Sequence, residues 1–207
     1  MTVSPGAAGK IAWNPGNHVF PTPAALVSCQ TPGGKPNLLT VAWCGNINSN
    51  PPMLSISLRP ERHSHAIIKE TGEFVLNLPS RRLARAVDFC GVASGRNLDK
   101  FAASGLSPFP VARVSCPGVA ECPVNLSCRV TQRVRLGSHD LFLAMIEETM
   151  VDFGLMDRNG RFQIEKADLI CYAHGFYFTF GKRLGRFGWS VGKVGRKHVY
   201  TRTDQKS

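Results

Sequence analysis

Short runs in which apolar and polar residues alternate, separated by glycine- and proline-rich turns, constrain the fold of this 207-residue chain most strongly. Side chains on a strand alternate between two faces, so a period of two predicts a β-strand with one buried face. MLSISL shows the pattern most clearly. The strands that we expect cover residues 23–30, 38–43, 53–58, 73–78, 124–134 and 141–152. About six or seven strands with few helices predict a mainly β fold with helical insertions, either a barrel or a sandwich.

Helices are expected at only three places. One begins near Ser64, a favourable N-cap residue, and ends at Gly72. A second helical stretch begins at Ser80, and a short helix follows within residues 97–105. We expect the polar segment CGNINSNPP, residues 44–52, to be a loop. Because helices do not alternate with strands along the chain, the pattern argues against a doubly wound α/β fold.

Length and charge predict a single domain over residues 1–190, followed by a basic tail over residues 191–207. From Gly181 onward the chain has eight lysine and arginine residues against one acidic residue, Asp204, within a total net charge of +11. Such a tail is compatible with nucleic acid or an acidic protein partner. A solvated tail, or a tail packed on a neighbouring subunit, is the simpler interpretation, and nucleic acid is the least favoured partner.

The seven cysteines argue against a zinc or thioredoxin-type motif, because no two of them have C-x-x-C spacing. Their odd number and apolar neighbours predict reduced, mostly buried thiols in a cytoplasmic protein. We expect no metal site, since Cys116, Cys122 and Cys128 lack an evident fourth ligand. We also expect neither a secretory signal nor a membrane-spanning segment.

Dinucleotide and P-loop motifs do not occur in the sequence. It contains neither G-x-G-x-x-G after a strand nor G-x-x-x-x-G-K-[ST], and the glycines of GRFGWSVG have the wrong spacing. G-x-S-x-G and H-E-x-x-H are also missing. A Rossmann-type site is therefore not predicted.

Basic and hydrogen-bonding residues gather in RPERHSH, where the strand over residues 53–58 gives way to the next helix. The four of interest are Arg59, Arg62, Ser64 and His65. Arginine forks, a hydroxyl group and the free N–H groups of a helix start are the donors that a phosphate dianion requires. The segment therefore favours a phosphate site, although ordinary capping and surface residues would also explain it.

Several longer stretches occur in a characteristic order, namely PAALVSC, PNLLTVAWCGNINSNPPMLSISLRPERHSHAIIKETGEFVLNLP, AVDFCGVASGRNLDKF, ECPVNLSCRV, LGSHDLFLAMI and AHGFYFTFGKRLGRFG. In these stretches the chain resembles the flavin reductase-like family of FMN-binding split β-barrel proteins, in particular its flavoredoxin-type members. The resemblance covers about residues 23–190. It implies a homodimer of six-stranded split barrels with FMN near the dimer interface.

The resemblance also implies which residues form the site. The cofactor-binding set is Thr40, Val41, Ala42, Trp43, Ser57, Arg59, Arg62, Ser64, His65, Asn77 and Lys100. A looser match assigns His139, Tyr172 and His174 to the surroundings of the ring and the substrate pocket. No catalytic residue is identified. Three alternatives stay open: Trp43 could belong to the barrel core, Asn77 could end a strand, and Lys100 could be solvated.

The function that we predict is an FMN-dependent oxidoreductase, an NAD(P)H-linked flavin reductase that receives electrons from NADH or NADPH. The alternative is a flavoredoxin-type FMN electron carrier that takes electrons from a protein partner, with the basic tail steering an acidic donor. A third interpretation is a nucleic-acid or regulatory binder that uses the same tail.

Overall fold

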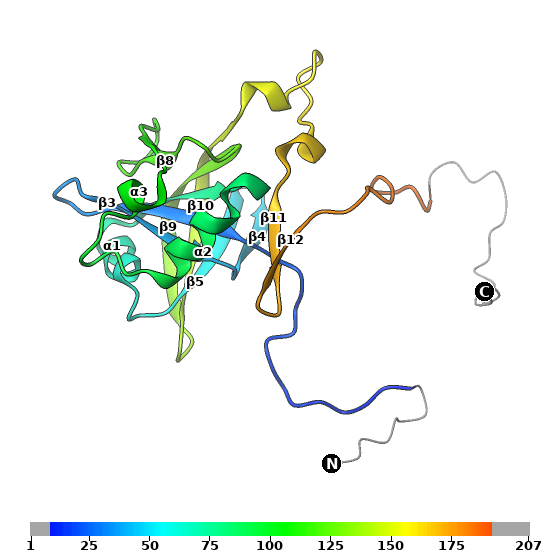
Figure 1. The fold of residues 1–207 in the computed structure, drawn as a ribbon, viewed down its shortest axis with the longest axis horizontal. Coiled ribbons are helices and arrows are strands. Elements are labelled where there is room, and N and C mark those ends of the chain that lie inside the picture. The colour runs from blue at the N-terminus through cyan, green and yellow to red at the C-terminus, as the bar shows by residue number, and fades with distance from the viewer. Residues whose placement is uncertain (1–8, 192–207) are drawn as a thin grey trace.

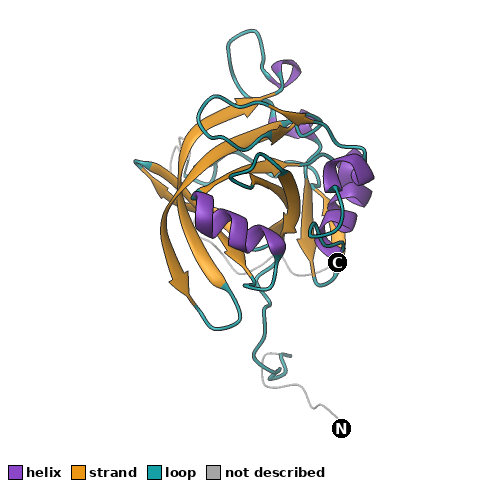
Figure 2. Ribbon diagram, turned by 90° about the vertical axis from the view of Figure 1, so that its left-hand side faces the viewer, coloured by secondary structure: helices purple, strands orange, loops and turns teal. Residues whose placement is uncertain are grey.

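Seven antiparallel strands form the main sheet of the computed structural model, which describes residues 9–191 (Figure 1). In sheet order the strands are β3 (Pro36–Val41), β2 (Ala25–Gln30), β6 (Glu73–Leu78), β9 (Val124–Arg135), β10 (Asp140–Val151), β5 (Pro52–Leu58) and β4 (Cys44–Ser49). The strands curve into a barrel, and one helix lies across one end of it (Figure 2). The prediction of a mainly β fold with helical insertions is confirmed, but the main sheet has seven strands and not the six that the resemblance implies.

Two smaller sheets and three helices complete the described part of the chain. The three-stranded sheet consists of β1 (Thr22–Pro23), β11 (Ile170–Ala173) and β12 (Phe176–Thr179), and the two-stranded sheet of β7 (Pro108–Phe109) and β8 (Gly118–Val119). The helices are α1 (His63–Thr71), α2 (Ala84–Val92) and α3 (Lys100–Ser104), with 3₁₀ turns at Arg81–Leu83, Phe153–Leu155 and Ile164–Ala167. All three helices lie where the sequence predicted them. Over residues 9–191, no helix combines the length and apolar character needed to cross a membrane.

The two largest clusters of the core lie on opposite faces of β2. Inside the barrel, residues such as Val27 and Ile56 pack against Ile68 of α1. On the outer face of the sheet, Leu26 packs in a cluster with Val87 of α2. Because both faces of β2 are covered, the strand is buried almost throughout, whereas β5 keeps the alternation that revealed it.

The loop expected over residues 44–52 is largely a strand, so this prediction is wrong. Strand β4 pairs antiparallel with β5, and a register shift lies between Asn46 and Asn48. It is the edge strand of the sheet, and every residue from Gly45 to Ser49 is exposed. Since neither face is buried, the sequence of β4 has no apolar alternation by which it could be recognised.

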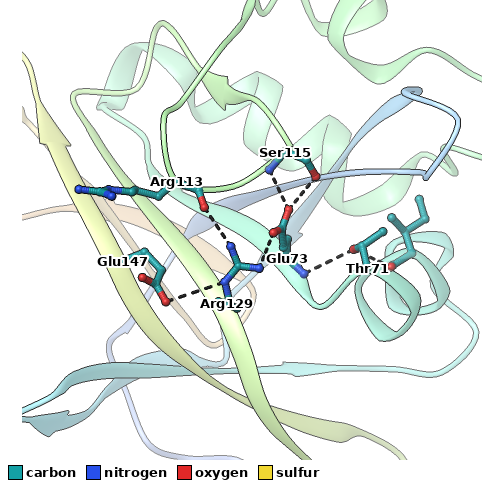
Figure 3. Close-up of polar contacts among 7 residues, drawn as sticks. Thr71, Glu73, Arg113, Ser115, Arg129 and Glu147 are labelled. Atoms are coloured by element: carbon teal, nitrogen blue, oxygen red, sulfur yellow. Dashed lines mark hydrogen bonds and ion pairs between the residues drawn. The ribbon is translucent and has the colours of Figure 1, made fainter.

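A polar network fixes the start of β6 to β9 and to the segment between β7 and β8 (Figure 3). The Arg129 guanidinium donates to Glu73 at 2.6 Å and to the carbonyl of Arg113 at 3.1 Å. The other carboxylate oxygen of Glu73 accepts from the N–H and from the hydroxyl of Ser115, both at 2.7 Å. Burial favours the neutral acid, but the Ser115 and Arg129 donors outweigh it and hold the pKa of Glu73 below its usual value.

Candidate functional site

A cavity of about 500 Å³ lies where β3 and β5 end, beside α2, and we call it the main cavity. Nine residues of the predicted site line it: Thr40, Val41, Ala42, Trp43, Ser57, Arg59, Arg62, His139 and Tyr172. The structure thus brings together segments that lie far apart in the sequence. Depressions with mixed apolar and polar walls of this volume are typical of small-molecule sites.

Close packing between α2 and β3 forms one wall of the main cavity. The Thr40 hydroxyl donates to the carbonyl of Val87. A Cβ atom added to Gly91 would lie 3.3 Å from the Cβ of Thr40, so a glycine allows the helix and the strand to approach. Beyond the end of β3, the Ser57 N–H donates to the Trp43 carbonyl at 2.9 Å. This hydrogen bond holds the segment between β3 and β4 against β5.

Trp43 and His139 lie together at the main cavity. Their ring centroids are 4.6 Å apart at an interplanar angle of 36°. Trp43 is 42% exposed, so the alternative that it belongs to the barrel core is wrong. Burial, reinforced by the charge of Arg59, lowers the pKa of His139, which favours the uncharged imidazole near neutral pH.

A second cavity of about 340 Å³ adjoins the main cavity and shares Leu39, Arg59 and Arg62 with it. Its lining also includes His63, Ser64 and Lys100. We call it the basic cavity because, among the described residues, its cations outnumber its one carboxylate, Glu61, which lies 3.7 Å from Arg59. Helix α1 begins at this wall, with Arg62 as N-cap, no side-chain cap and no acidic residue in its first turn. The N–H groups and dipole of the helix start therefore add to the positive character of the basic cavity.

Lys100 is the most unusual residue of the basic cavity. It is only 3% exposed, and its ammonium group donates to the Cys90 carbonyl at 2.7 Å. Within residues 9–191 no carboxylate pairs with it. Burial lowers the pKa of Lys100, the Cys90 thiol opposes this effect, and the charge of Arg62 adds to it. The alternative that Lys100 is solvated is therefore wrong, and a buried cation without a counter-ion indicates a place for an anion.

Ser64 is held at the wall of the basic cavity by Asn37. The Asn37 amide donates to the Ser64 hydroxyl oxygen at 2.7 Å, and both side chains are buried. Gly95 makes this arrangement possible, because a Cβ atom there would lie 1.8 Å from the side-chain oxygen of Asn37. The loop after α2 thus closes over Asn37 and Ser64 only with a glycine at this position.

Two residues of the predicted set, His65 and Asn77, lie outside the main and basic cavities. The buried His65 has its Nε2 atom 2.8 Å from the Asp140 carboxylate, which Arg133 also contacts at 3.4 Å. Asn77 is fully buried, and its side-chain oxygen accepts from the amide of Asn125 at 2.8 Å. Both side chains make hydrogen bonds inside the protein and face neither cavity.

His174 lines a third cavity of about 400 Å³, which adjoins the main cavity. The main cavity is also lined by residues that sequence reasoning missed, among them Asn17, Asp88, Gly91, Val92 and Tyr177. The Tyr177 hydroxyl donates to Asp88 at 3.2 Å, and burial, together with the Asp88 charge, raises the pKa of Tyr177 to about 12. The spacing of Asp88 and Gly91 within one predicted helix puts them on one face, which was a usable signal. No sequence signal pointed to Tyr177, because the pairing of β11 with β1, near the other end of the chain, brings its hairpin to the site.

Known proteins resemble this chain over most of its length. The flavin reductase-like domain matches residues 17–166. Flavoredoxin of Desulfovibrio vulgaris (Miyazaki F) is 32% identical, and the two structures superpose with a TM-score of 0.83 over 89% of this chain and 100% of that chain. Flavoredoxin from Methanosarcina acetivorans is 27% identical, with a TM-score of 0.80 over 88% of this chain and 98% of that chain.

A curated relative matches over a shorter region. An uncharacterized protein of Archaeoglobus fulgidus is 35% identical over 112 residues, which are 54% of this chain and 63% of that protein. The chain spans between 55% and 65% of the length of the first three curated relatives that it matches.

Proposed function

Because the chain belongs to the flavin reductase-like family and has the split-barrel fold of its FMN-binding members, we propose that it is an FMN-dependent oxidoreductase. FMN has a planar ring system at one end and a phosphate dianion at the other. The main cavity and the basic cavity adjoin each other and offer one environment for each end.

The buried ammonium group of Lys100 carries the proposal. It has no carboxylate partner within residues 9–191, and Arg62, Ser64 and the start of α1 lie around the same cavity. A phosphate there would accept charge-assisted hydrogen bonds from these groups and would neutralise a cation that is otherwise costly to bury. Arg59 would contribute from the boundary between the two cavities.

The ring system of FMN would occupy the main cavity. Backbone groups from Thr40 to Trp43 would bind its polar edge, and the Trp43 and His139 rings would cover it. His65 and Asn77 are not included in the proposed site, because their side chains bond elsewhere. Bound FMN would supply the hydride- and electron-transfer chemistry, while the protein positions it and excludes water.

The electron donor in this proposal is NADH or NADPH. The sequence has no G-x-G-x-x-G fingerprint, so a nicotinamide nucleotide would bind transiently beside the flavin rather than in a Rossmann-type site of its own. The test is anaerobic mixing of FMN-loaded protein with NADH, with NADPH and, as a control, with NAD⁺. We expect one of the reduced nucleotides to bleach the flavin absorbance and NAD⁺ to leave it unchanged.

A flavoredoxin-type electron carrier is the second candidate, and the similarity to flavoredoxin over the whole length of that chain favours it. If neither reduced nucleotide bleaches bound FMN, the reductase proposal is wrong and the carrier remains. A carrier steered by charge would lose electron transfer from an acidic donor at high salt. Of the basic C-terminal residues, Lys182, Arg183 and Arg186 are described by the structure, and those from Lys193 onward lie outside the described residues.

We also propose that the protein is a homodimer in the cytoplasm. Large apolar side chains are exposed on both terminal segments, among them Trp13, Phe178 and Trp189, and a second copy would cover them. All seven cysteines are free thiols, as a reducing compartment would maintain them. Sedimentation equilibrium should give twice the chain mass, and the mass of one chain would disprove the dimer.

A further inference from the structure

The third cavity is an aromatic chamber beside the main cavity. Its volume is about 400 Å³, and its walls include Asn17, Phe20, Trp43, Tyr172 and His174. Three of these residues, Asn17, Trp43 and Tyr172, also line the main cavity, so a ligand in the chamber would lie next to whatever the main cavity holds. Among residues 9–191, neither cation nor carboxylate side chains line the chamber, in contrast to the basic cavity.

His174 forms one wall of the chamber from a turn position at which asparagine is more usual. It is the first of the two residues that connect β11 to β12, because Ala173 pairs with Phe176 across the hairpin. His174 has a φ of 47° and Gly175 a φ of 90°. Two-residue turns with both φ values positive favour Asn-Gly, since asparagine and glycine adopt the left-handed region most readily. A residue held in a sparsely populated conformation at the rim of a cavity points to a role in that cavity.

The His174 imidazole packs against aromatic rings of the N-terminal segment. The His174 ring meets the Phe20 ring edge-on, with centroids 5.8 Å apart at an angle of 74°. Trp13 lies 6.5 Å from His174 and stacks on His18 at 4.4 Å. Figure 1 shows the tip of the β11–β12 hairpin beside the N-terminal segment that carries these rings. The hairpin turn therefore encloses the chamber by packing His174 against that segment.

The lining sets the chemistry of the ligand. Aromatic walls favour a planar aromatic molecule, which they can meet edge-on or in offset stacks. Within residues 9–191, the Asn17 carboxamide and the Tyr172 hydroxyl make no hydrogen bond to another side chain or to the backbone, so both can donate to a ligand oxygen. The volume suits a molecule of one or two fused rings.

We propose that the chamber binds a small, uncharged, planar aromatic carbonyl compound of the quinone type, and that His174 is a binding residue for it. That the neighbouring ligand is a flavin rests on the proposed function; the binding itself does not. A molecule bound in the chamber would lie next to the ligand of the main cavity.

The experiment measures binding of 2,3-dimethyl-1,4-naphthoquinone by equilibrium dialysis, without a nicotinamide nucleotide. The quinone ring of this probe is fully substituted, so thiols do not add to it. We expect one probe molecule per chain, with and without saturating FMN. Replacing the imidazole by the smaller amide in His174→Asn should weaken probe binding about three- to tenfold. The same variant should unfold at the same or a higher temperature, because asparagine suits the turn.

Phe153→Ala is the matched control, since Phe153 is 93% exposed in a 3₁₀ turn and does not line the chamber. It should bind the probe as the wild type does. If His174→Asn does not fold, Phe20→Leu provides the same comparison. Wild-type protein that does not bind the probe, or a folded variant with unchanged affinity, would overturn the proposal. Dialysis against FMN alone is run in parallel. A failure to bind FMN counts against the proposed function, whereas a failure to bind the probe counts against the proposed aromatic ligand of the chamber.

Discussion

The ammonium group of Lys100 is stabilised poorly by its surroundings. One backbone carbonyl accepts from it, burial lowers its pKa, and the charge of Arg62 opposes it further. Binding of a phosphate would reverse this balance, because a nearby anion favours the charged ammonium. The ligand that we propose would thus relieve a local cost of folding and raise the stability of the protein by mass action.

Arg62→Ala tests the phosphate contact at single-residue resolution. It should weaken FMN binding by about 1.5–3 kcal/mol, the cost of losing a charge-assisted hydrogen bond. Riboflavin has no phosphate, so it should bind the wild type and the variant equally. Calorimetric titration of both ligands measures this difference. Arg82→Ala is the control, because Arg82 is exposed in the 3₁₀ turn before α2 and outside the cavities. An Arg62→Ala variant with wild-type affinity for FMN would remove Arg62 from the site.

At the scale of elements, the start of β6 depends on the Glu73 network of Figure 3. The folded-state pKa of Glu73 is below its ordinary value of 4.5. Its carboxylate therefore contributes stability above the unfolded-state pKa, and this contribution is lost as the pH falls through the lowered folded-state value. We expect Glu73→Gln to lower the free energy of unfolding by about 1–3 kcal/mol near neutral pH.

The same variant should show a shallower loss of stability on acidification than the wild type, which urea unfolding at a series of pH values would measure. Glu70→Gln is the control, because Glu70 is exposed on α1 and forms no ion pair within the described residues. Parallel pH profiles for wild type and Glu73→Gln would mean that the network does not hold the carboxylate charge in the folded protein.

The positions of the three helices and of most long strands could be predicted from the sequence, whereas the four-residue strands β11 and β12 were not expected. Alternation identified β5, and the end of α1 at Gly72 is confirmed by its left-handed φ of 70°. Strand β4 was missed because both of its faces are exposed. His65 was assigned to the site with its neighbour Ser64, but consecutive helix residues point about 100° apart. One therefore faces the basic cavity and the other faces Asp140.

In the whole molecule, the candidate site lies where the barrel, the outer helices and the last hairpin meet. The barrel provides the ends of β3 and β5, the outer layer provides α2 and Lys100 at the start of α3, and the last hairpin adds Tyr172 and Tyr177. The resemblance had assigned Tyr172 to the site, but the contribution of Tyr177 could not be predicted, because it depends on the pairing of β12 with β11 and of β11 with β1. The site is therefore a property of the complete tertiary structure.

Titration of the wild-type protein with FMN and with riboflavin measures directly how much the phosphate contributes to binding. One FMN should bind per chain, at least about tenfold more tightly than riboflavin, since only FMN brings a phosphate to Lys100 and Arg62. A colourless protein without affinity for FMN, or equal affinity for the two flavins, would contradict the proposed FMN site.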